Sequence, residues 1–332
     1  MFEVVYMRLG IYGFGSIGRL ITKLALERGH EVVGVIDIDE GIIGRDAGEL
    51  LGLGSLGVRV GRDVLELSDA DVVIHATTSY LDRAYNQIKS VIELGISIVS
   101  TCETLAFPYY RYPVLALRLD RLARDYGVVV LGTGINPGFI FDTLVVTLAA
   151  TVPTISRLRV VRSLDVGKRR EALRKKLGVG EDPVVVRRRL ESGELSGHVG
   201  YAESIYLIAL AGDLNITKVV EYQEPIPAEE TIVCGGVRVE KGMCKGVRGY
   251  GVGYVGSKDV IKVEFNAYVG APEYDEIVIE GKEFNVTWRS TGTHGDLGTA
   301  AIILNTVERI HQLPPGLHLI TELLPFKIRF LI

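Results

Sequence analysis

The chain has 332 residues, of which 47% are hydrophobic and 23% are charged, so it is long enough for two domains with ordinary cores. Its formal net charge of -4 gives no electrostatic reason to expect nucleic acid or an anionic membrane as a partner. Its three cysteines are too few for a disulfide framework and fit a reducing compartment, although Cys234 and Cys244 could pair across a hairpin.

The sequence carries no targeting, membrane or metal-binding signal. Met1 to Met7 has no basic region of the kind that opens a signal peptide, so we expect a cytoplasmic protein. The apolar stretch 135–161 is interrupted by charged residues and prolines that are costly in lipid, which argues against a membrane span. No cluster of histidine, cysteine and carboxylate residues has metal-ligand spacing, and no metal is predicted.

A glycine-rich turn follows the first predicted element. Residues 8–12 predict a strand and residues 19–28 a helix, and between them stands Gly13-Phe14-Gly15-Ser16-Ile17-Gly18. Glycines in this order allow a tight turn, close approach of the backbone to a pyrophosphate, and close packing of the helix, whose N-terminus favours negative charge. The pattern predicts a dinucleotide site.

A second strand, over residues 31–36, ends in Asp37, which stands 19 positions after Gly18. A carboxylate there accepts hydrogen bonds from the ribose hydroxyls of NAD and repels a 2′-phosphate. NAD is therefore favoured, and NADP stays the alternative because Arg45 could bend back towards a phosphate. The alternative role for Asp37 itself is a solvated loop residue.

Strands and helices continue to alternate as far as residue 131. This alternation calls for a parallel sheet with right-handed crossovers. We therefore expect an α/β fold whose residues 1–139 form a Rossmann-type doubly wound domain. The further strands are predicted over residues 71–75, 96–100 and 128–131, and the helices over residues 81–94 and 114–126.

Two loops follow the carboxyl ends of these strands, where such sheets bind ligands. The first holds Thr77, Thr78 and Ser79, and the second runs from Gly132 to Phe139. We expect cofactor contacts from the first loop and from Asn136 and Pro137 of the second, with Asn136 also facing the substrate. Its alternative role is a turn residue before proline. His75 is interpreted as a core residue or a neighbour of the cofactor.

After Phe139 the pattern changes to a helix over residues 142–149 and then to alternating strands. These predict an α+β domain over residues 140–292 with a largely antiparallel sheet that binds substrate and, through an exposed face, a second copy. An apolar helix over residues 299–312 is expected to pack back on the first domain, which the segment from about 293 to 332 completes. The strands are predicted over residues 157–163, 218–222, 231–239, 260–268 and 275–279, and short basic runs at 168–170, 175–176 and 187–189 are interpreted as solvated helix faces.

Glu103 comes just after the apolar strand 96–100, at the same edge of the predicted sheet. A carboxylate beside a nicotinamide can move protons to or from a nitrogen or oxygen on the carbon that exchanges hydride, and can stabilise a passing cation. That chemistry suits an iminium. The structural alternative is that Glu103 caps a helix or pairs with an arginine such as Arg111.

Two strings, residues 100–108 around Thr101-Cys102-Glu103 and residues 132–139 around Asn136, resemble the 2,4-diaminopentanoate dehydrogenases and related native amine dehydrogenases, relatives of dihydrodipicolinate reductase. The resemblance covers nearly the whole chain. It departs from the family at Gly298, where alanine is expected, and at His294, which leaves the exact substrate open. Further matching strings stand at residues 44–50, 176–180, 197–204 and 295–301.

The resemblance implies an NAD(P)-dependent oxidative deamination, in which the C4 amine of a 2,4-diaminopentanoate-like substrate becomes a ketone and ammonia, and the reverse amination. It implies that Glu103 is the catalytic acid-base and that His198 faces the substrate. A substrate carboxylate needs a cation, and Arg162, Lys168 and Arg169 are the candidates, with Arg162 taken as the substrate residue. The partners are small molecules and a second subunit, with no nucleic acid and no membrane.

Two other functions remain open at this point. One is a dihydrodipicolinate reductase-like imine reductase, although the adjacent histidines of that family are missing here. The other is a regulatory protein that binds NAD without catalysis, against which Glu103 argues.

Overall fold

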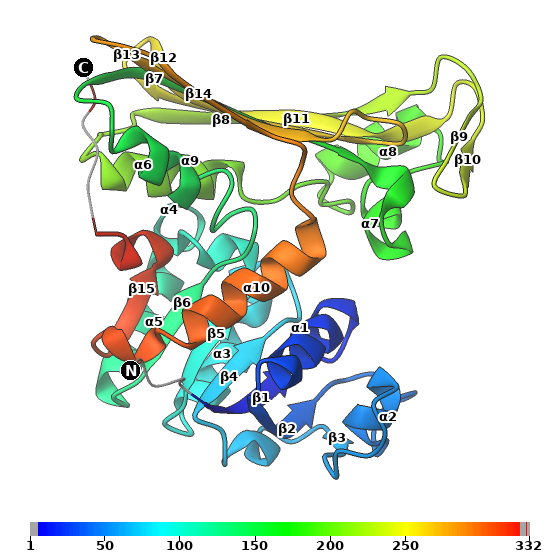
Figure 1. The fold of residues 1–332 in the computed structure, drawn as a ribbon, viewed down its shortest axis with the longest axis vertical. Coiled ribbons are helices and arrows are strands. Elements are labelled where there is room, and N and C mark those ends of the chain that lie inside the picture. The colour runs from blue at the N-terminus through cyan, green and yellow to red at the C-terminus, as the bar shows by residue number, and fades with distance from the viewer. Residues whose placement is uncertain (1–5, 326–329, 331–332) are drawn as a thin grey trace. The chain divides into compact units, whose positions relative to one another are not determined.

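The computed structural model describes residues 6–325 and 330. Within that range the chain forms two compact units, unit 1 with residues 6–139 and 294–323, and unit 2 with residues 140–293, 324, 325 and 330. Most of the Met1 to Met7 segment and the last part of the segment 293–332 lie outside the described residues. Figure 1 shows the order of the elements in each unit.

Unit 1 is built on a seven-stranded sheet in the order β15-β6-β5-β4-β1-β2-β3, with every neighbouring pair parallel. The order reverses beside β1, as in a doubly wound sheet, so the predicted fold class is confirmed. The strands are β1 (Arg8–Tyr12), β2 (Glu31–Ile36), β3 (Val60–Gly61), β4 (Val72–His75), β5 (Ser97–Ser100), β6 (Val129–Gly132) and β15 (Gly316–Leu319).

Helices form a hydrophobic core on each side of this sheet. Because neighbouring strand residues point to opposite faces, Val73 packs in the core with α3 and α5, whereas Ile74 packs in the core with α1 and α10. The longer helices bury residues three or four apart, for example Leu81, Ala84 and Ile88 of α3. The helices are α1 (Ser16–Glu27), α2 (Ala47–Leu51), α3 (Leu81–Ile92), α4 (Pro108–Arg111), α5 (Pro113–Asp125) and α10 (Gly295–Val307).

The last helix, α10, packs against α1 within unit 1. Its Ile303 and Val307 share a core cluster with Ile21 of α1. The helix begins four residues earlier than the predicted residue 299, because the His294 side chain accepts a hydrogen bond from the Leu297 N–H (3.3 Å) and so caps the first turn.

Unit 2 contains a six-stranded sheet in the order β14-β13-β7-β12-β11-β8. The β7–β12 pair is parallel and the other neighbours are antiparallel, in agreement with the predicted, largely antiparallel sheet. The strands are β7 (Ile155–Asp165), β8 (Lys218–Pro227), β11 (Cys244–Val255), β12 (Lys258–Tyr268), β13 (Tyr274–Gly281) and β14 (Val286–Ser290). The helices are α6 (Thr143–Ala149), α7 (Glu171–Lys176), α8 (Pro183–Glu191) and α9 (Tyr201–Ala211).

Three strand segments of unit 2 differ from the sequence prediction, and one of them, β14, was not predicted at all. Strand β11 was not predicted because it is rich in glycine, which disfavours strands. A Cβ atom at Gly251 would stand 2.7 Å from the Tyr201 Cβ atom, and one at Gly253 2.6 Å from the Ile205 Cγ2 atom, so close packing of α9 requires these glycines. The predicted strand 231–239 is wrong: it is a separate hairpin of β9 (Ile232–Cys234) and β10 (Val237–Val239) that turns at two glycines.

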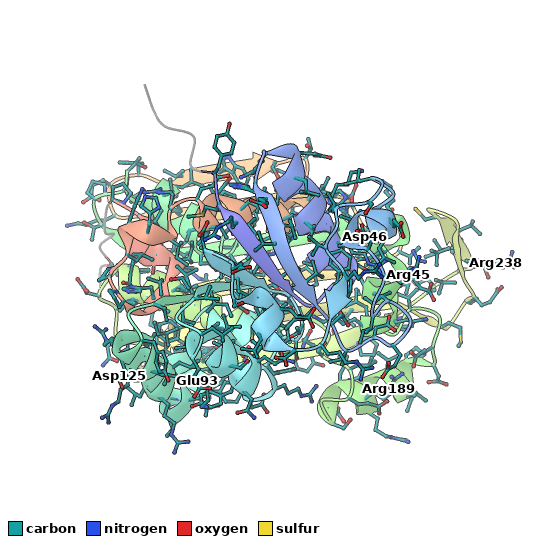
Figure 2. The ribbon with its side chains drawn as sticks, turned by 90° about the horizontal axis from the view of Figure 1, so that it is seen from below. Arg45, Asp46, Glu93, Asp125, Arg189 and Arg238 are labelled. Carbon is teal, nitrogen blue, oxygen red and sulfur yellow. The ribbon has the colours of Figure 1, made fainter. Side chains whose placement is uncertain are left out.

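Several smaller predictions have clear outcomes. Two of the basic runs lie on α7 and α8, where Lys175 pairs with Glu171 (2.7 Å) and Arg189, labelled in Figure 2, pairs with Glu194 (2.8 Å). Cys234 and Cys244 are free thiols and do not pair. Within the described part of the chain, no helix combines the length and the apolar character that crossing a membrane requires.

Candidate cofactor and catalytic site

The glycine-rich turn joins β1 to α1, and its three glycines have different structural requirements. Gly13 has a φ of 97°, and a Cβ atom there would stand 2.6 Å from the Ala76 carbonyl oxygen. A Cβ atom at Gly18 would stand 1.9 Å from the Gly13 carbonyl oxygen. A Cβ atom at Gly15 would meet nothing within 4 Å. Packing therefore explains why Gly13 and Gly18 are glycines. Gly15 instead has open space beside it at the N-terminus of α1, where Ser16 and Ile17 form the first turn. This space fits the approach of a pyrophosphate.

Asp37 lies directly after β2, and the backbone holds its carboxylate in place. One oxygen accepts a hydrogen bond from the Phe14 N–H, and the other accepts from the N–H groups of Ile38 (2.7 Å) and Asp39 (2.9 Å). A carboxylate has about four acceptor positions, so capacity remains for ribose hydroxyls. The Phe14 side chain is fully buried in the core, so this residue contributes to the turn through its backbone.

Glu103 is the first residue of a 3-10 turn (Glu103–Leu105) that follows β5, and it is half-buried. The next residue, Thr104, is fully buried. Its hydroxyl oxygen accepts from the Leu81 N–H (2.8 Å) and donates to the Ser79 carbonyl oxygen (3.2 Å), which also accepts from the Thr104 N–H (3.1 Å). These bonds tie the turn that carries Glu103 to the loop after β4 that contains Thr77, Thr78 and Ser79.

A second set of hydrogen bonds joins the same two segments through His75. The Cys102 N–H donates to the Ser100 hydroxyl (3.1 Å), which contacts His75 Nδ1 (2.8 Å). His75 Nε2 contacts Gln87 Oε1 (2.8 Å), which also accepts from the Thr77 hydroxyl (2.7 Å). Burial lowers the pKa of His75 to about 4, so the ring is neutral at physiological pH. His75 is thus a buried structural connection between the β4 and β5 ends.

The loop after β6 coils tightly around Gly138, which has a φ of 126°. A Cβ atom there would stand 2.5 Å from both the Gly134 carbonyl oxygen and the Thr133 hydroxyl oxygen. The Asn136–Pro137 peptide bond is cis, and Pro137 is buried. Among the described residues, the buried side-chain atoms without a hydrogen-bond partner include Thr133 Oγ1 and Asn136 Oδ1. Thr133 was not among the residues predicted from the sequence, although it lies inside the glycine-rich string 132–139.

Unit 2 brings together the two substrate residues predicted there, Arg162 and His198. Arg162 lies on β7, in register with Phe265 of β12, and is 2% exposed. The His198 ring stacks on Phe265 with ring centres 4.6 Å apart and meets Tyr201 edge-on, also at 4.6 Å. Burial, together with the positive charges of Lys176 and Arg162, lowers the pKa of His198 to about 3, so its ring is neutral.

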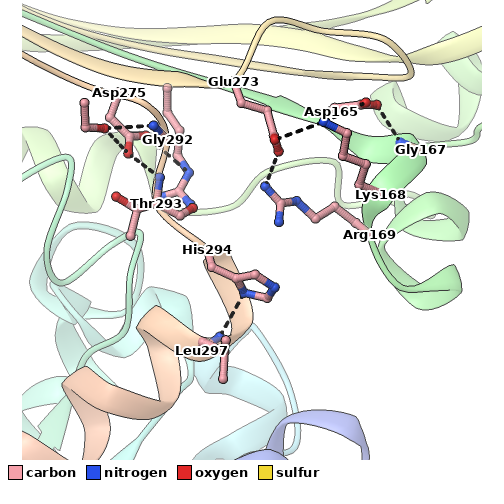
Figure 3. A network of polar contacts seen from close by, with 12 residues as sticks. Asp165, Gly167, Lys168, Arg169, Glu273, Asp275, Gly292, Thr293, His294 and Leu297 are labelled. Atoms are coloured by element: carbon pink, nitrogen blue, oxygen red, sulfur yellow. Dashed lines mark hydrogen bonds and ion pairs between the residues drawn. The ribbon is translucent and has the colours of Figure 1, made fainter. Parts of the chain in front are cut away.

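Arg162 differs from the other two candidate cations, Lys168 and Arg169, in its ion pairing. Lys168 and Arg169 both pair with Glu273, at 3.3 Å and 2.5 Å (Figure 3). Arg162 donates through Nη2 to the Thr293 carbonyl oxygen (2.7 Å) and lies 3.7 Å from the Asp275 carboxylate through Nε. Within the described residues, its Nη1 atom is buried without a hydrogen-bond partner, and so are His198 Nε2 and the Tyr201 hydroxyl. Arg162 therefore keeps a donor available for an anion.

No group of three or more histidine, cysteine or carboxylate side chains in the described ranges 6–325 and 330 could hold a metal ion. The polar groups above can instead bind a dinucleotide in unit 1 and a small anion in unit 2. Along the chain, these candidate residues come in the order of the glycine turn, Asp37 at the end of β2, the Glu103 turn, the Asn136 loop and then the unit 2 residues.

Residues 139–328 match the family described as the 2,4-diaminopentanoate dehydrogenase C-terminal domain. The 2,4-diaminopentanoate dehydrogenase of Acetoanaerobium sticklandii is 30% identical to the chain, with 97% of this chain and 93% of that protein covered. The chain belongs to the 2,4-diaminopentanoate dehydrogenase family. The predicted family is thereby confirmed, as is the prediction that the protein is an enzyme, a dehydrogenase.

Further comparisons concern the N-terminal part of the chain and the fold of the whole chain. Residues 7–102 match the family described as dihydrodipicolinate reductase, N-terminus. Over 94 residues, the 4-hydroxy-tetrahydrodipicolinate reductase of Archaeoglobus fulgidus is 40% identical, but this covers only 28% of the chain and 35% of that protein. An amine dehydrogenase from Mycobacterium smegmatis has the same fold, with a TM-score of 0.86 at 24% identity and 97% of each chain covered. GenD2, from gentamicin A biosynthesis and solved in complex with NAD, has a TM-score of 0.57 at 15% identity, with 97% of this chain and 93% of that chain covered.

Proposed function

We propose that the protein is an NAD(P)-dependent amine dehydrogenase that deaminates a small 2,4-diaminopentanoate-like substrate at C4, giving a ketone and ammonia, and that aminates the ketone in reverse. The observation that carries this proposal is the position of Glu103 just beyond the carboxyl end of β5, held by Thr104 against the loop after β4. The family membership supports the same reaction class.

The residues of unit 1 fit a dinucleotide. Gly15 leaves room for a pyrophosphate at the N-terminus of α1, where the close packing of Gly13 and Gly18 sets the turn, and three backbone N–H groups orient Asp37 for the ribose hydroxyls. When bound, a nicotinamide accepts a hydride from the amine-bearing carbon and returns it in the reverse direction. We assign the loop after β4 and the loop with Asn136 and Pro137 to the nicotinamide half.

We assign NAD as the preferred cofactor because a fixed carboxylate repels a 2′-phosphate. The arginines near Asp37 in sequence have other partners: Arg59 donates to the Gly44 carbonyl oxygen (2.9 Å), and Arg62 forms an ion pair with Glu40. Arg45, beside the helix-capping Asp46 in Figure 2, is the remaining cation through which NADP would be accommodated.

Glu103 is the proton carrier in the proposed mechanism. Its carboxylate accepts a proton from the substrate ammonium, which frees the nitrogen lone pair to form a C=N bond as the carbon loses hydride. Glu103 then releases that proton to solvent, and its restored negative charge stabilises the iminium cation. The carboxylate next deprotonates the water that attacks the iminium carbon and returns this proton to the nitrogen of the resulting carbinolamine, which leaves as ammonia while the carbinol oxygen loses its own proton. In the reverse direction the carboxyl group protonates the departing oxygen.

In unit 2 we assign Arg162 and His198 to the substrate. The buried guanidinium has an unused Nη1 donor and can bind a carboxylate, whereas a plain amine offers it nothing. The neutral His198 ring, stacked on Phe265, adds a polar atom without a second charge. Arg162 therefore favours a diamino acid over a simple amine.

The test is NADH oxidation by the purified protein with ammonia and 2-amino-4-oxopentanoate, compared with simple ketones and with the cyclic substrate of dihydrodipicolinate reductases. Turnover with the amino-ketone alone, or far faster than with ketones, is the expected result. Turnover with the cyclic substrate would instead favour an imine reductase, for which the match of residues 7–102 is the supporting observation. Tight NAD binding without any turnover would favour a regulatory protein.

Glu103→Gln keeps the size of the side chain and removes its base. We expect at least about a hundredfold lower turnover, the size of a typical general acid-base contribution, with NADH binding nearly unchanged. Glu322→Gln, which changes a carboxylate elsewhere in unit 1 that bonds His318, serves as a control for the loss of one charge. A Glu103→Gln enzyme as fast as the wild type would refute the mechanism.

We also propose a cytoplasmic homodimer formed through the open face of the unit 2 sheet. Helix α9 packs against the face on which Gly249, Gly251 and Gly253 lie, so Tyr250 faces the other side, next to Tyr222 (5.6 Å between ring centres). The free thiols fit a reducing compartment. Light scattering should give twice the chain mass of 36.3 kDa, and Tyr250→Glu should lower it to one chain. A monomeric wild type would contradict the proposed dimer.

A further inference from the structure

Two oxygen atoms of the loop after β6 have no hydrogen-bond partner although they are buried. They are Thr133 Oγ1, on a residue that is 3% exposed, and Asn136 Oδ1. Buried polar atoms in folded proteins nearly always have a partner, and leaving one without a partner costs stability. Two such atoms within four residues of one another therefore point to a group that they bind.

The backbone holds this loop in one shape. The Thr133 N–H donates to the Ser100 carbonyl oxygen (2.9 Å), which anchors the loop at the ends of β5 and β6. Gly138 packs so closely on Thr133 and Gly134 that a methyl group would clash with both. On the other side, a Cβ atom at Gly134 would lie 3.7 Å from the Thr299 Cγ2 atom of α10. Rearrangement of the loop to find other donors is thus restricted.

The chemistry of the two atoms selects the kind of group. An asparagine Oδ1 can only accept a hydrogen bond, and a threonine hydroxyl can accept one while donating another. A carboxylate or phosphate would place its oxygens against the Asn136 acceptor and is disfavoured. A group with N–H donors, either neutral or cationic, satisfies both atoms.

We propose that Thr133 and Asn136 together form a binding site for an N–H group of the reactants, with Thr133 as a positioning residue that no sequence pattern had indicated. The inference deepens the proposed function and rests on it. Two sources share this chemistry, the carboxamide NH2 of the nicotinamide and the ammonia or amine nitrogen of the substrate. Both would be held at the edge of the sheet where Glu103 stands.

Thr133→Val is the main test because valine has the shape of threonine without the hydroxyl. If the source is the carboxamide, NADH should bind about threefold to tenfold more weakly by fluorescence titration, the usual effect of one lost hydrogen bond. Binding of ADP-ribose, which lacks the nicotinamide, should not change. The 3-acetylpyridine analogue of the cofactor, which has no N–H on this group, should bind wild type and variant equally well.

If the source is the nitrogen substrate, the KM for ammonia should rise by a similar factor while NADH affinity stays the same. Thr133→Ser keeps the hydroxyl and should restore wild-type behaviour in either case. Thr306→Val is the matched control, since Thr306 is also 3% exposed and its hydroxyl bonds only the Ile302 carbonyl oxygen of its own helix (2.8 Å).

Two results would overturn the proposal. One is a Thr133→Val protein whose NADH affinity and ammonia KM both equal those of the wild type. The other is an equal loss of affinity for NADH, the acetylpyridine analogue and ADP-ribose, which would indicate general damage to the loop. The binding measurements need no turnover, so they remain informative if the proposed amine reaction itself proves wrong.

Discussion

Substitutions in the glycine turn after β1 can distinguish a glycine that is needed for packing from a glycine that is needed for ligand binding. A methyl group at Gly18 would stand 1.9 Å from the Gly13 carbonyl oxygen, far inside normal contact, and this oxygen belongs to the backbone and cannot turn away as a side chain could. Helix α1 would have to shift, and we expect Gly18→Ala to lower the free energy of unfolding by about 3 kcal/mol, the upper end of overpacking effects. That corresponds to a melting temperature roughly 6–12 °C lower.

Gly15→Ala should behave differently, because its Cβ atom meets no protein atom within 4 Å and its φ of -73° suits alanine. As the residue that caps α1, it should lose at most about 1 kcal/mol of stability. The methyl group would instead occupy the space in which a pyrophosphate approaches the backbone. We expect NADH to bind at least about tenfold more weakly, a loss of about 1.4 kcal/mol.

Thermal unfolding with and without NADH measures both effects at once. At a concentration of 100 times the wild-type dissociation constant, NADH should stabilise the wild type by about 2.7 kcal/mol and a tenfold weaker Gly15→Ala variant by about 1.4 kcal/mol. Gly18→Ala should start from the lower melting temperature. A Gly15→Ala protein that NADH stabilises as strongly as the wild type would refute the assignment of this space to the cofactor, and a fully stable Gly18→Ala protein would refute the packing argument.

Two further predictions concern the buried side chains of His75 and Arg162. The pKa of His75 falls from 6.5 to about 4 on folding, so below pH 6.5 the unfolded chain binds a proton that the folded chain does not. This difference should lower the free energy of unfolding by roughly 3 kcal/mol as the pH falls from 6.5 to 4. Urea unfolding of His75→Gln should therefore show a smaller decrease in the free energy of unfolding over the same pH range. An equal slope in both proteins would contradict the burial of a neutral ring. Arg162→Lys keeps the charge beside Asp275 but changes the donor geometry, and should lower kcat/KM for 2-amino-4-oxopentanoate by about tenfold or more while sparing simple ketones. A parallel loss for both substrates would argue against carboxylate recognition.

The sequence predicted unit 1 more completely than unit 2, and the reason lies in the pattern of each. The strands of unit 1 are short apolar runs that alternate with helices such as α3, whose buried residues recur every three or four positions. Strand β11 has no such signal, because its glycines are required by contact with Tyr201 and Ile205 of α9, some fifty residues away in the chain. A requirement of that kind is invisible to local periodicity.

By itself, the sequence determined the glycine turn, the acidic end of β2 and the position of Glu103 after β5, because each depends on residues adjacent in the chain. Only the tertiary structure decided which polar groups remain available. Glu273 engages Lys168 and Arg169 from about a hundred positions away and leaves Arg162 with an unused donor. The coil around Gly138 likewise leaves Thr133 and Asn136 without partners. Hydrogen bonding and ion pairing are satisfied in space, so they appear only once the chain is folded.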